Sequence, residues 1–394
     1  MIISNTKRKI ILFLSKFYYW FCKRDKNIWV FGEWFGNRCC DNCLYFANYV
    51  KETKPDIKIV WLSNEGVDLS RLSKDIEVQR IDSPKAINYL KHAGVVFFSH
   101  GMIDLTYKER HYYSGSLAVN LWHGSTPWKK IHFDTPMDLF HKILLYTLTK
   151  WHEGNLYIVS SEIVFKIFQS AFHCSNRDVI RAGCPKNTVL YSKDFIDRSR
   201  RELIKYCKKH NISVNDDVKI VTYLPTFREK GDEVFSFKGK TIKGINDILE
   251  KNNAILVQKM HYASQKVNGD DFSNKRIITL KDYYTQELLA ASDILISDYS
   301  SCIFDYLILD RPIIHFIYDY DSFKNTARGL YFTKDEVISG DAVDNMNDLI
   351  ETLNLSLEDS NYGKEIRAER RKQFLEYESP LSCKIIFENI MNRL

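Results

Sequence analysis

Glycine and proline are scarce in this chain of 394 residues, which contains 16 glycines and 8 prolines. It also has no internal repeat and no low-complexity tract. Apolar residues make up 45% of the sequence, so the composition excludes fibrous and disordered proteins. The length exceeds that of one ordinary hydrophobic core, and we therefore predict two folded domains.

Net charge is missing from most of the chain. The formal charge of the whole sequence is +6, and residues 1–26 hold seven Lys or Arg residues against a single Asp, a net charge of +6. Residues 27–394 are therefore neutral overall. This balance argues against a nucleic-acid partner.

The N-terminal segment, residues 1–26, is basic and amphipathic. Its apolar stretch from Ile10 to Cys22 is interrupted by Lys16 and is shorter than the roughly 20 residues that span a bilayer. No small-residue cleavage site of a secretory signal is present. Two interpretations stay open: an interfacial helix drawn to an anionic membrane surface, or an ordinary first helix with a solvated basic face. We favour a membrane-associating segment.

The nine cysteines lack the spacing of a metal site or a disulfide framework. Cys40 and Cys43 are spaced like one half of a zinc site, but no second pair of ligands completes it. We expect reduced, mostly buried thiols in an intracellular protein. No pair or cluster of carboxylates stands out either, so we predict neither a metal nor a cofactor.

Short apolar runs rich in Val and Ile predict buried strands with helices between them. In the first half they span 28–32, 57–63, 94–100, 117–123, 156–161 and 179–183. In the second half they span 218–226, 254–261, 276–280, 293–298 and 312–317. Such strands predict parallel sheets covered on both faces, and two sets predict two doubly wound domains. We place these domains at 27–200 and at 201–394, the second with C-terminal helices.

Polar residues cluster where these strands end. They are His123, Gly124, Ser125, Thr126 and Lys129 in the first domain, and Arg228, Lys259, His261, Asp298, Ser300, Ser301 and, further on, Arg328 in the second. Ligands of open parallel sheets bind beyond the carboxyl ends of the strands, so these residues predict a cleft between the domains. Each has a structural alternative, because a strand-end His often packs, Ser caps a helix and Arg forms surface ion pairs.

Six segments occur in the order of a known family. They are LWHGSTPWKKIHFD, RAGCPKN, YLPTFRE, VQKMHY, LISDYSSCIFDYLILDRPIIHF and ARGLYF. From about residue 28 to 380 the chain resembles the CDP-glycerol glycerophosphotransferase family, which comprises teichoic-acid primases and polymerases and related capsule enzymes. It departs from the family pattern by one extra residue between Gly124 and Pro127, by Trp128 in place of the usual Leu, and by Gly-Cys-Pro-Lys-Asn-Thr at 183–188.

The resemblance implies an α/β fold of the GT-B type, with two Rossmann-type domains facing a central cleft. It implies a peripheral enzyme on the cytoplasmic face of a bacterial membrane. The implied reaction transfers a polyol phosphate, most simply glycerol phosphate, from a CDP-linked donor to a hydroxyl of a lipid-linked or glycan acceptor and releases CMP. Such reactions build teichoic-acid or capsule-type polymers.

The resemblance also implies roles for the strand-end residues. His123 would be the general base and His261 would serve the transferred phosphate, although sequence alone allows the two roles to be exchanged. Donor binding would fall to Arg228, Lys259, Asp298, Ser300, Ser301 and Arg328, and acceptor binding to Gly124, Ser125, Thr126 and Lys129. A nucleotide-sugar glycosyltransferase of the same architecture and a non-catalytic membrane scaffold are the alternatives.

Overall fold

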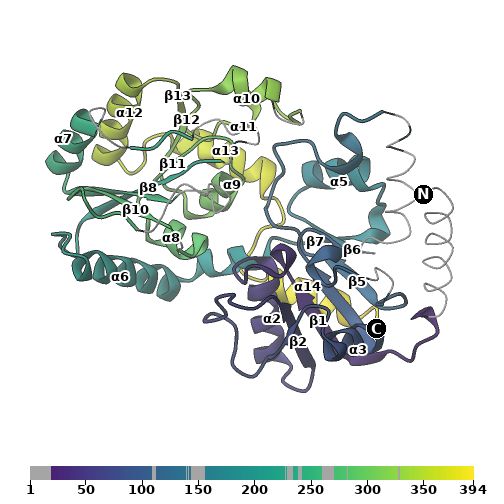
Figure 1. Ribbon diagram of the computed structural model, residues 1–394. Coiled ribbons are helices and arrows are strands. Elements are labelled where there is room, and N and C mark those ends of the chain that lie inside the picture. The colour runs from purple at the N-terminus through teal and green to yellow at the C-terminus, as the bar shows by residue number, and fades with distance from the viewer. Residues whose placement is uncertain are drawn as a thin grey trace, which may run out of the picture.

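The structure is a computed structural model of the chain. It describes residues 19–108, 112–138, 140, 142, 156–226, 228, 234–237, 242–259, 270–281, 283–326 and 329–394. These residues form two α/β domains that lie side by side (Figure 1). The prediction of two domains with parallel sheets is confirmed.

The N-terminal domain contains a seven-stranded sheet with the strand order β3-β2-β1-β4-β5-β6-β7. Its strands are β1 (Asp25–Gly32), β2 (Lys58–Ser63), β3 (Glu77–Arg80), β4 (Ala93–Phe98), β5 (Leu117–Asn120), β6 (Leu156–Val159) and β7 (Val179–Arg181). Every pairing between them is parallel. The order places β4 and β5 side by side at the centre of the sheet.

The C-terminal domain contains a six-stranded sheet with the strand order β10-β9-β8-β11-β12-β13. Its strands are β8 (Lys219–Leu224), β9 (Ala254–Lys259), β10 (Ile277–Leu280), β11 (Ile294–Ser297), β12 (Ile313–Phe316) and β13 (Asp341–Val343). These pairings are parallel as well. In both sheets the strand order reverses next to the first strand, which is where doubly wound folds bind ligands.

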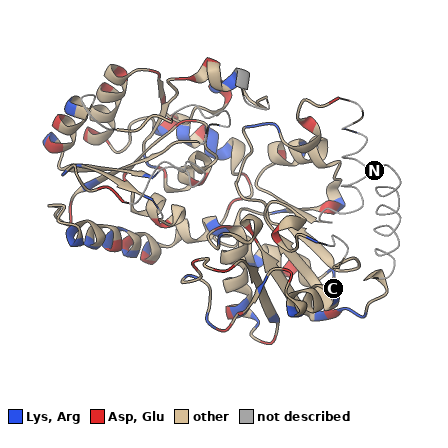
Figure 2. Ribbon diagram, in the orientation of Figure 1, with Lys and Arg blue, Asp and Glu red and all other residues tan. Residues whose placement is uncertain are grey.

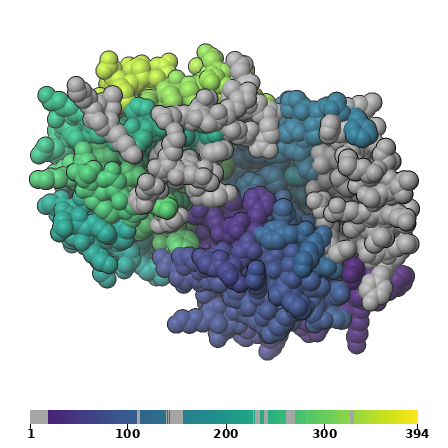
Figure 3. Space-filling model, in the orientation of Figure 1, coloured from purple at the N-terminus to yellow at the C-terminus, as the bar shows by residue number. Residues whose placement is uncertain are grey.

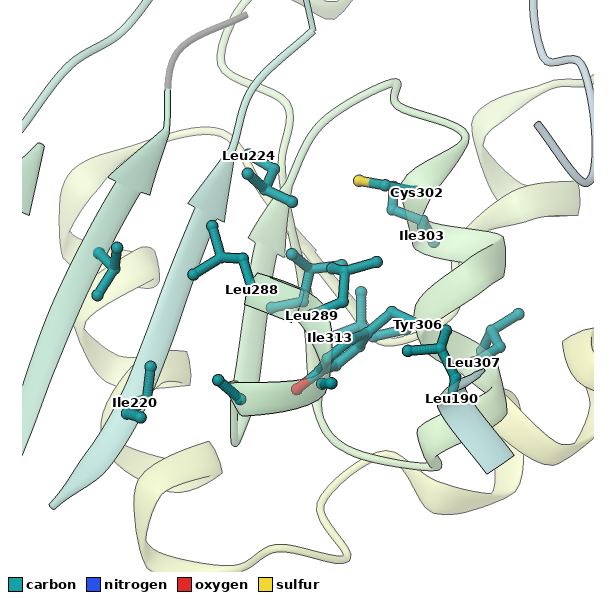
Figure 4. Packing of buried hydrophobic residues seen from close by; sticks show 14 of the residues in the cluster. Leu190, Ile220, Leu224, Leu288, Leu289, Cys302, Ile303, Tyr306, Leu307 and Ile313 are labelled. Carbon is teal, nitrogen blue, oxygen red and sulfur yellow. The ribbon is translucent and has the colours of Figure 1, made fainter. Parts of the chain in front are cut away.

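Helices cover the faces of both sheets. They are α2 (Asn42–Thr53), α3 (Pro84–His92), α5 (Glu162–Phe172), α6 (Lys193–Lys209), α7 (Lys243–Lys251), α8 (Thr285–Ala291), α9 (Cys302–Tyr306), α10 (Tyr320–Thr326), α11 (Lys334–Val337), α12 (Met346–Glu358), α13 (Lys364–Phe374) and α14 (Ser382–Met391). Serine side chains cap the first free N–H groups of α3, α5 and α6. The C-terminal core packs α8, α9 and β12 together through residues such as Leu289, Tyr306 and Ile313 (Figure 4).

The predicted domain boundary at 200/201 does not coincide with the places where the chain passes from one domain to the other. That boundary falls inside α6, whose Leu203 and Cys207 pack in the core of the C-terminal domain. The last helix, α14, returns to the N-terminal domain, where Ile386 and Ile390 join its core. The chain therefore crosses between the domains twice (Figure 1).

Two edge strands were not predicted from the sequence. Both β3 and β13 are short. In β3 exposed residues alternate with half-buried ones, and in β13 two exposed residues precede one buried residue. An edge strand faces solvent on one side and needs no continuous apolar run, so it lacks the signal that identifies the central strands.

The predicted N-terminal segment lies largely outside the described residues, which begin at 19. Trp20 and Phe21 are 59% and 82% exposed. Arg24, in contrast to these two exposed residues, donates hydrogen bonds to backbone carbonyls, including that of Leu90 at 2.7 Å. The first strand, β1, begins at the next residue, Asp25. The end of this segment is therefore anchored in the fold. Among the described residues, no helix has the length and apolarity needed to cross a membrane.

Charges of both signs are interspersed over the two domains (Figure 2). Helix α6 illustrates this, because its outer face carries Lys and Arg next to Asp and Glu. Among the residues that the structure describes, charges of opposite sign are thus mixed and do not form two large opposed patches in this view.

Candidate active site

His123 follows a sharp turn at the end of β5. Asn120 accepts a hydrogen bond from the backbone N–H of Trp122 at 2.9 Å, and Trp122 adopts the left-handed conformation with φ = 56°. A bulky residue in this region is strained and is held there by its surroundings. The Trp122 ring packs on Phe168 and Phe172, which anchors the turn. The turn presents His123 at the carboxyl end of the sheet.

The imidazole of His123 lies flat against the imidazole of His100. The ring centroids are 4.1 Å apart and the planes differ by 5°. Burial, and then the neighbouring His100, lowers the pKa of His123 to about 3. Burial lowers the pKa of His100 to about 4. Both rings are therefore neutral near pH 7, which is the state that a general base requires.

Gly124, a predicted site residue of the N-terminal domain, faces Ser301, a predicted residue of the C-terminal domain. A Cβ atom added to Gly124 would lie 2.9 Å from Oγ and 3.2 Å from Cβ of Ser301, so a larger residue at 124 would require Ser301 to shift. Ser300 and Ser301 are partly exposed at the start of α9, and Ser300 Oγ accepts a hydrogen bond from the N–H of Cys302 at 3.4 Å. The structure therefore brings His123-Gly124 and Ser300-Ser301 together.

Figure 3 shows the surface receding between the N-terminal and the C-terminal domain. The backbone of Lys129 pairs with that of Leu330, and Lys130 N–H donates to the carbonyl of Gly329 at 2.8 Å. The Lys129 ammonium lies 4.8 Å from the centre of the Phe323 ring. The segment that follows His123 is thus held against Gly329 and Leu330 of the C-terminal domain.

Ser125 and Thr126 are buried in the contact between the domains. Ser125 is 2% exposed and donates to Oδ1 of Asp305 at 2.7 Å, while Asn187 donates to Ser125 at 2.9 Å. Thr126 is 0% exposed. A direct acceptor contact by these two side chains would require this contact to open. The hydrogen bonds of Ser125 support a role in joining the domains, whereas the buried hydroxyl of Thr126 has no hydrogen-bond partner among the described residues.

Lys186 lies at the centre of this contact, and its role was not predicted from the sequence. Its ammonium is 3.3 Å from Asp41, 3.2 Å from Asp305 and 3.1 Å from the backbone carbonyl of His123. The two carboxylates raise its pKa well above the usual value and outweigh burial. Lys186 therefore links the backbone of His123 to Asp41 in the N-terminal domain and to Asp305 in the C-terminal domain.

Glu378 adds the C-terminal crossing segment to the same cluster. It accepts hydrogen bonds from Asn187 at 2.9 Å and from the N–H of Cys184 at 3.0 Å. Burial raises its pKa to about 7. Residues from the 3-10 helix η5 (Pro185–Tyr191), from α9 and from the crossing segment thus share one buried polar network. Glu378 could not be recognised in the sequence, because it lies in a stretch without a predicted strand or a recognised motif.

Arg228 is engaged in a buried ion pair. Its guanidinium is 2.9 Å from Asp298 and 2.7 Å from Asp319, and its side chain is 4% exposed. Asp298 also accepts hydrogen bonds from the N–H and hydroxyl of Thr226, at 2.8 and 2.6 Å. With these partners, Arg228 and Asp298 shape the loop after β8. A direct phosphate contact by either would have to replace these bonds.

Two of the predicted residues, His261 and Arg328, lie outside the described residues. Lys259 lies at the end of β9 and donates to Oγ1 of Thr285 at 2.9 Å. Within the described ranges, no group of three or more His, Cys, Asp or Glu side chains is arranged to hold a metal ion.

Comparison with known proteins places the chain in a family. The model of the family described as CDP-Glycerol:Poly(glycerophosphate) glycerophosphotransferase matches residues 14–392. The chain is 28% identical over 349 residues to the teichoic acid poly(glycerol phosphate) polymerase of Bacillus spizizenii, which covers 84% of each protein. It is 26% identical over 382 residues to the teichoic acid glycerol-phosphate transferase of Staphylococcus aureus, which covers 92% of this chain and 94% of that protein.

A solved structure with the same fold is that of the wall teichoic acid polymerase TagF. It matches with a TM-score of 0.75 at 20% identity, over 99% of this chain and 97% of that one. The family match extends over nearly the whole sequence and both domains. The chain is therefore an enzyme of the CDP-glycerol:poly(glycerophosphate) glycerophosphotransferase family.

Proposed function

We propose that this protein transfers glycerol phosphate from CDP-glycerol to a hydroxyl of a lipid-linked or glycan acceptor in teichoic-acid synthesis. The observation that carries the proposal is the partly exposed, neutral His123, held at the domain junction beside the Gly124–Ser301 contact. Membership of the family supports CDP-glycerol as the donor. His123 is assigned as the general base.

The reaction needs one proton transfer and one substitution at phosphorus. The acceptor hydroxyl gives its proton to Nε2 of His123 while its oxygen forms a bond to the phosphorus that carries glycerol. The bond from this phosphorus to the bridging oxygen breaks, and CMP leaves with that oxygen. Ser300 and Ser301 are assigned to the donor phosphates, together with His261, Arg328 and Lys259.

The activity is tested by incubating the purified protein with CDP-glycerol and an acceptor lipid that ends in glycerol phosphate. We expect release of CMP and growth of the acceptor by one or more glycerol phosphate units, read by chromatography and mass spectrometry. CDP-ribitol and nucleotide sugars serve as competing donors. Turnover of a nucleotide sugar to a glycoside, with none of CDP-glycerol, would contradict the proposal.

We also assign the N-terminal residues to binding the cytoplasmic surface of a bacterial membrane. The concentration of basic residues in 1–26 and the exposed Trp20 and Phe21 support this. Deleting residues 1–18, which spares the anchored Arg24 and β1, is expected to reduce pelleting with vesicles that contain anionic lipid. Neutral vesicles are the control. A truncated protein that pellets like the full chain with anionic vesicles would refute the assignment.

Replacing Arg328 with Ala is expected to weaken CMP binding about tenfold or more. Loss of one charge-assisted contact to a phosphate costs roughly 1.5–3 kcal/mol, and the next residue, Gly329, is bonded to the segment after His123. Calorimetric titration with CMP measures the effect. Arg177→Ala, which removes an arginine with an 89% exposed side chain, is the matched control. Equal CMP affinity in both variants would exclude Arg328 from the donor site.

A further inference from the structure

The stacked pair of His100 and His123 has a common support in Ser99. Both histidines follow central, neighbouring strands, because Phe98 of β4 pairs with Asn120 of β5. Ser99 Oγ lies 2.8 Å from Nδ1 of His100, and the carbonyl oxygen of Ser99 lies 3.4 Å from Nδ1 of His123. One residue therefore contacts the same ring nitrogen of both histidines.

The contact with the Ser99 carbonyl determines where the ring of His123 carries its proton. A carbonyl oxygen can only accept, so Nδ1 of His123 must carry the hydrogen in this contact. The hydroxyl of Ser99 lies between Nδ1 of His100 and Asp104, at 2.8 and 3.1 Å, and this contact fixes the ring of His100 whichever atom donates. In the neutral ring of His123, Nε2 is then free of hydrogen and able to accept a proton.

The support beneath the pair is rigid. Asp104 on η2 (Met102–Asp104) accepts hydrogen bonds from the backbone N–H groups of Ser99 and His100, both at 2.8 Å, and of Phe35 at 2.7 Å. The rings of Trp34 and Phe35 pack on His100 with centroid distances of 4.4 and 4.9 Å. Both aromatic residues have positive φ, 49° and 56°, a strained conformation that recurs at functional sites.

We propose that His100 is a positioning residue for the general base. Its ring, fixed by Ser99 and covered by Trp34, lies flat against His123 and holds the Nδ1–H of His123 on the Ser99 carbonyl. Nε2 of His123 is thereby directed away from Ser99 and is available for the proton of the acceptor. This inference rests on the proposed function, because it assumes that His123 is the base.

The charged groups around His123 come from three further elements. Asp41, at the start of α2, favours protonation of the ring, whereas Lys186, on η5 (Pro185–Tyr191), opposes it. Asp104 lies behind Ser99. Burial is the largest cause of the lowered pKa of His123, and the ring of His100 covers one face. Removing that ring admits water, so the pKa of His123 should rise toward its ordinary value of about 6.5.

The test compares His100→Ala, which removes the ring, with His100→Phe, which keeps a flat ring without the polar contacts. We expect His100→Ala to lower kcat about 10–100-fold with little change in KM for CDP-glycerol. The acid limb of kcat/KM should move to higher pH, because a base with a raised pKa is protonated earlier as pH falls. His100→Phe should recover much of kcat. His92→Phe, at the other end of β4, is the matched control.

A purely structural role would lower the melting temperature and the active fraction without moving the acid limb. Unchanged kcat and an unchanged acid limb in His100→Ala would overturn the proposal. If neither variant folds, nuclear magnetic resonance of ¹⁵N-histidine in the wild type decides, with His123→Asn identifying the signal. A hydrogen on Nδ1 of His123 supports the proposal, and a hydrogen on Nε2 overturns it.

The same experiments separate this inference from the proposed function. A wild-type protein that releases no CMP, or a His123→Asn variant that retains turnover, refutes both. An active wild type, an inactive His123→Asn and an unaffected His100→Ala refute only the positioning role of His100.

Discussion

Replacing His123 with Asn is expected to lower kcat by about 10²–10⁴-fold, the usual contribution of a general base. Asn keeps a polar side chain of similar reach but cannot take the proton. CMP affinity should stay near that of the wild type, because the nucleotide is assigned to the other domain. Single-turnover assays of CMP release and calorimetric titration with CMP measure the two quantities.

The control is His92→Gln, which changes an exposed histidine just before β4, at the end of the sheet remote from His123. It should leave kcat unchanged. If His123→Asn is folded, as judged by its melting temperature, and retains more than about a tenth of wild-type turnover, His123 is not the base. A large loss of CMP affinity in that variant would instead assign His123 to the donor side.

The strand-end residues were predictable because the strands that carry them are central and apolar. β5 and β11 are almost completely buried, so they appear in the sequence as continuous apolar runs. The residues that follow them, His123 and Ser300, consequently stand at the carboxyl edge of the sheets. The structure brings the segments that contain them together at Gly124 and Ser301.

His100 was missed although it ends the predicted strand at 94–100. The sequence does not reveal that β4 lies directly beside β5, and only this neighbourhood stacks His100 on His123. A search for every histidine at a strand end would have found it. The significance of Ser99 requires coordinates, because it depends on which ring nitrogen each of its oxygens contacts.

The buried ion pairs are the other feature that could not be predicted from the sequence. Arg228 and Lys186 look like surface or phosphate-binding residues in a sequence, because charged side chains are rarely buried without a partner. Their partners are distant: Asp319 is 91 residues from Arg228, and Asp305 is 119 residues from Lys186. Such pairings follow from the meeting of elements far apart in the chain, which local patterns do not encode.

Replacing Lys186 with Met is expected to lower the free energy of unfolding by about 3–5 kcal/mol. The side chains of Asp41 and Asp305 are only 7% and 1% exposed, and without the ammonium they would be buried next to each other with no cation between them. Met preserves the length and apolar stem of Lys, so loss of the charge is the main change. Urea denaturation followed by circular dichroism measures the difference.

The matched control is Lys251→Met, which breaks the exposed ion pair with Glu358 and should change stability by less than about 1 kcal/mol. Adding Asp305→Asn to Lys186→Met should restore part of the loss, because one uncompensated carboxylate is removed. A Lys186→Met protein within about 1 kcal/mol of the wild type would show that the buried pair is not a major source of stability.

The stabilising effect of the Lys186 ion pairs should decrease only as the pH rises. Because the two carboxylates raise the pKa of Lys186 well above its usual value, its stabilising effect is complete below the pKa of an ordinary lysine, about 10.4. It is lost as the pH rises through the raised pKa. The difference between wild type and Lys186→Met should thus stay constant across the neutral range and shrink only in strong alkali. The loss of the bond to the His123 carbonyl should lower turnover throughout that range.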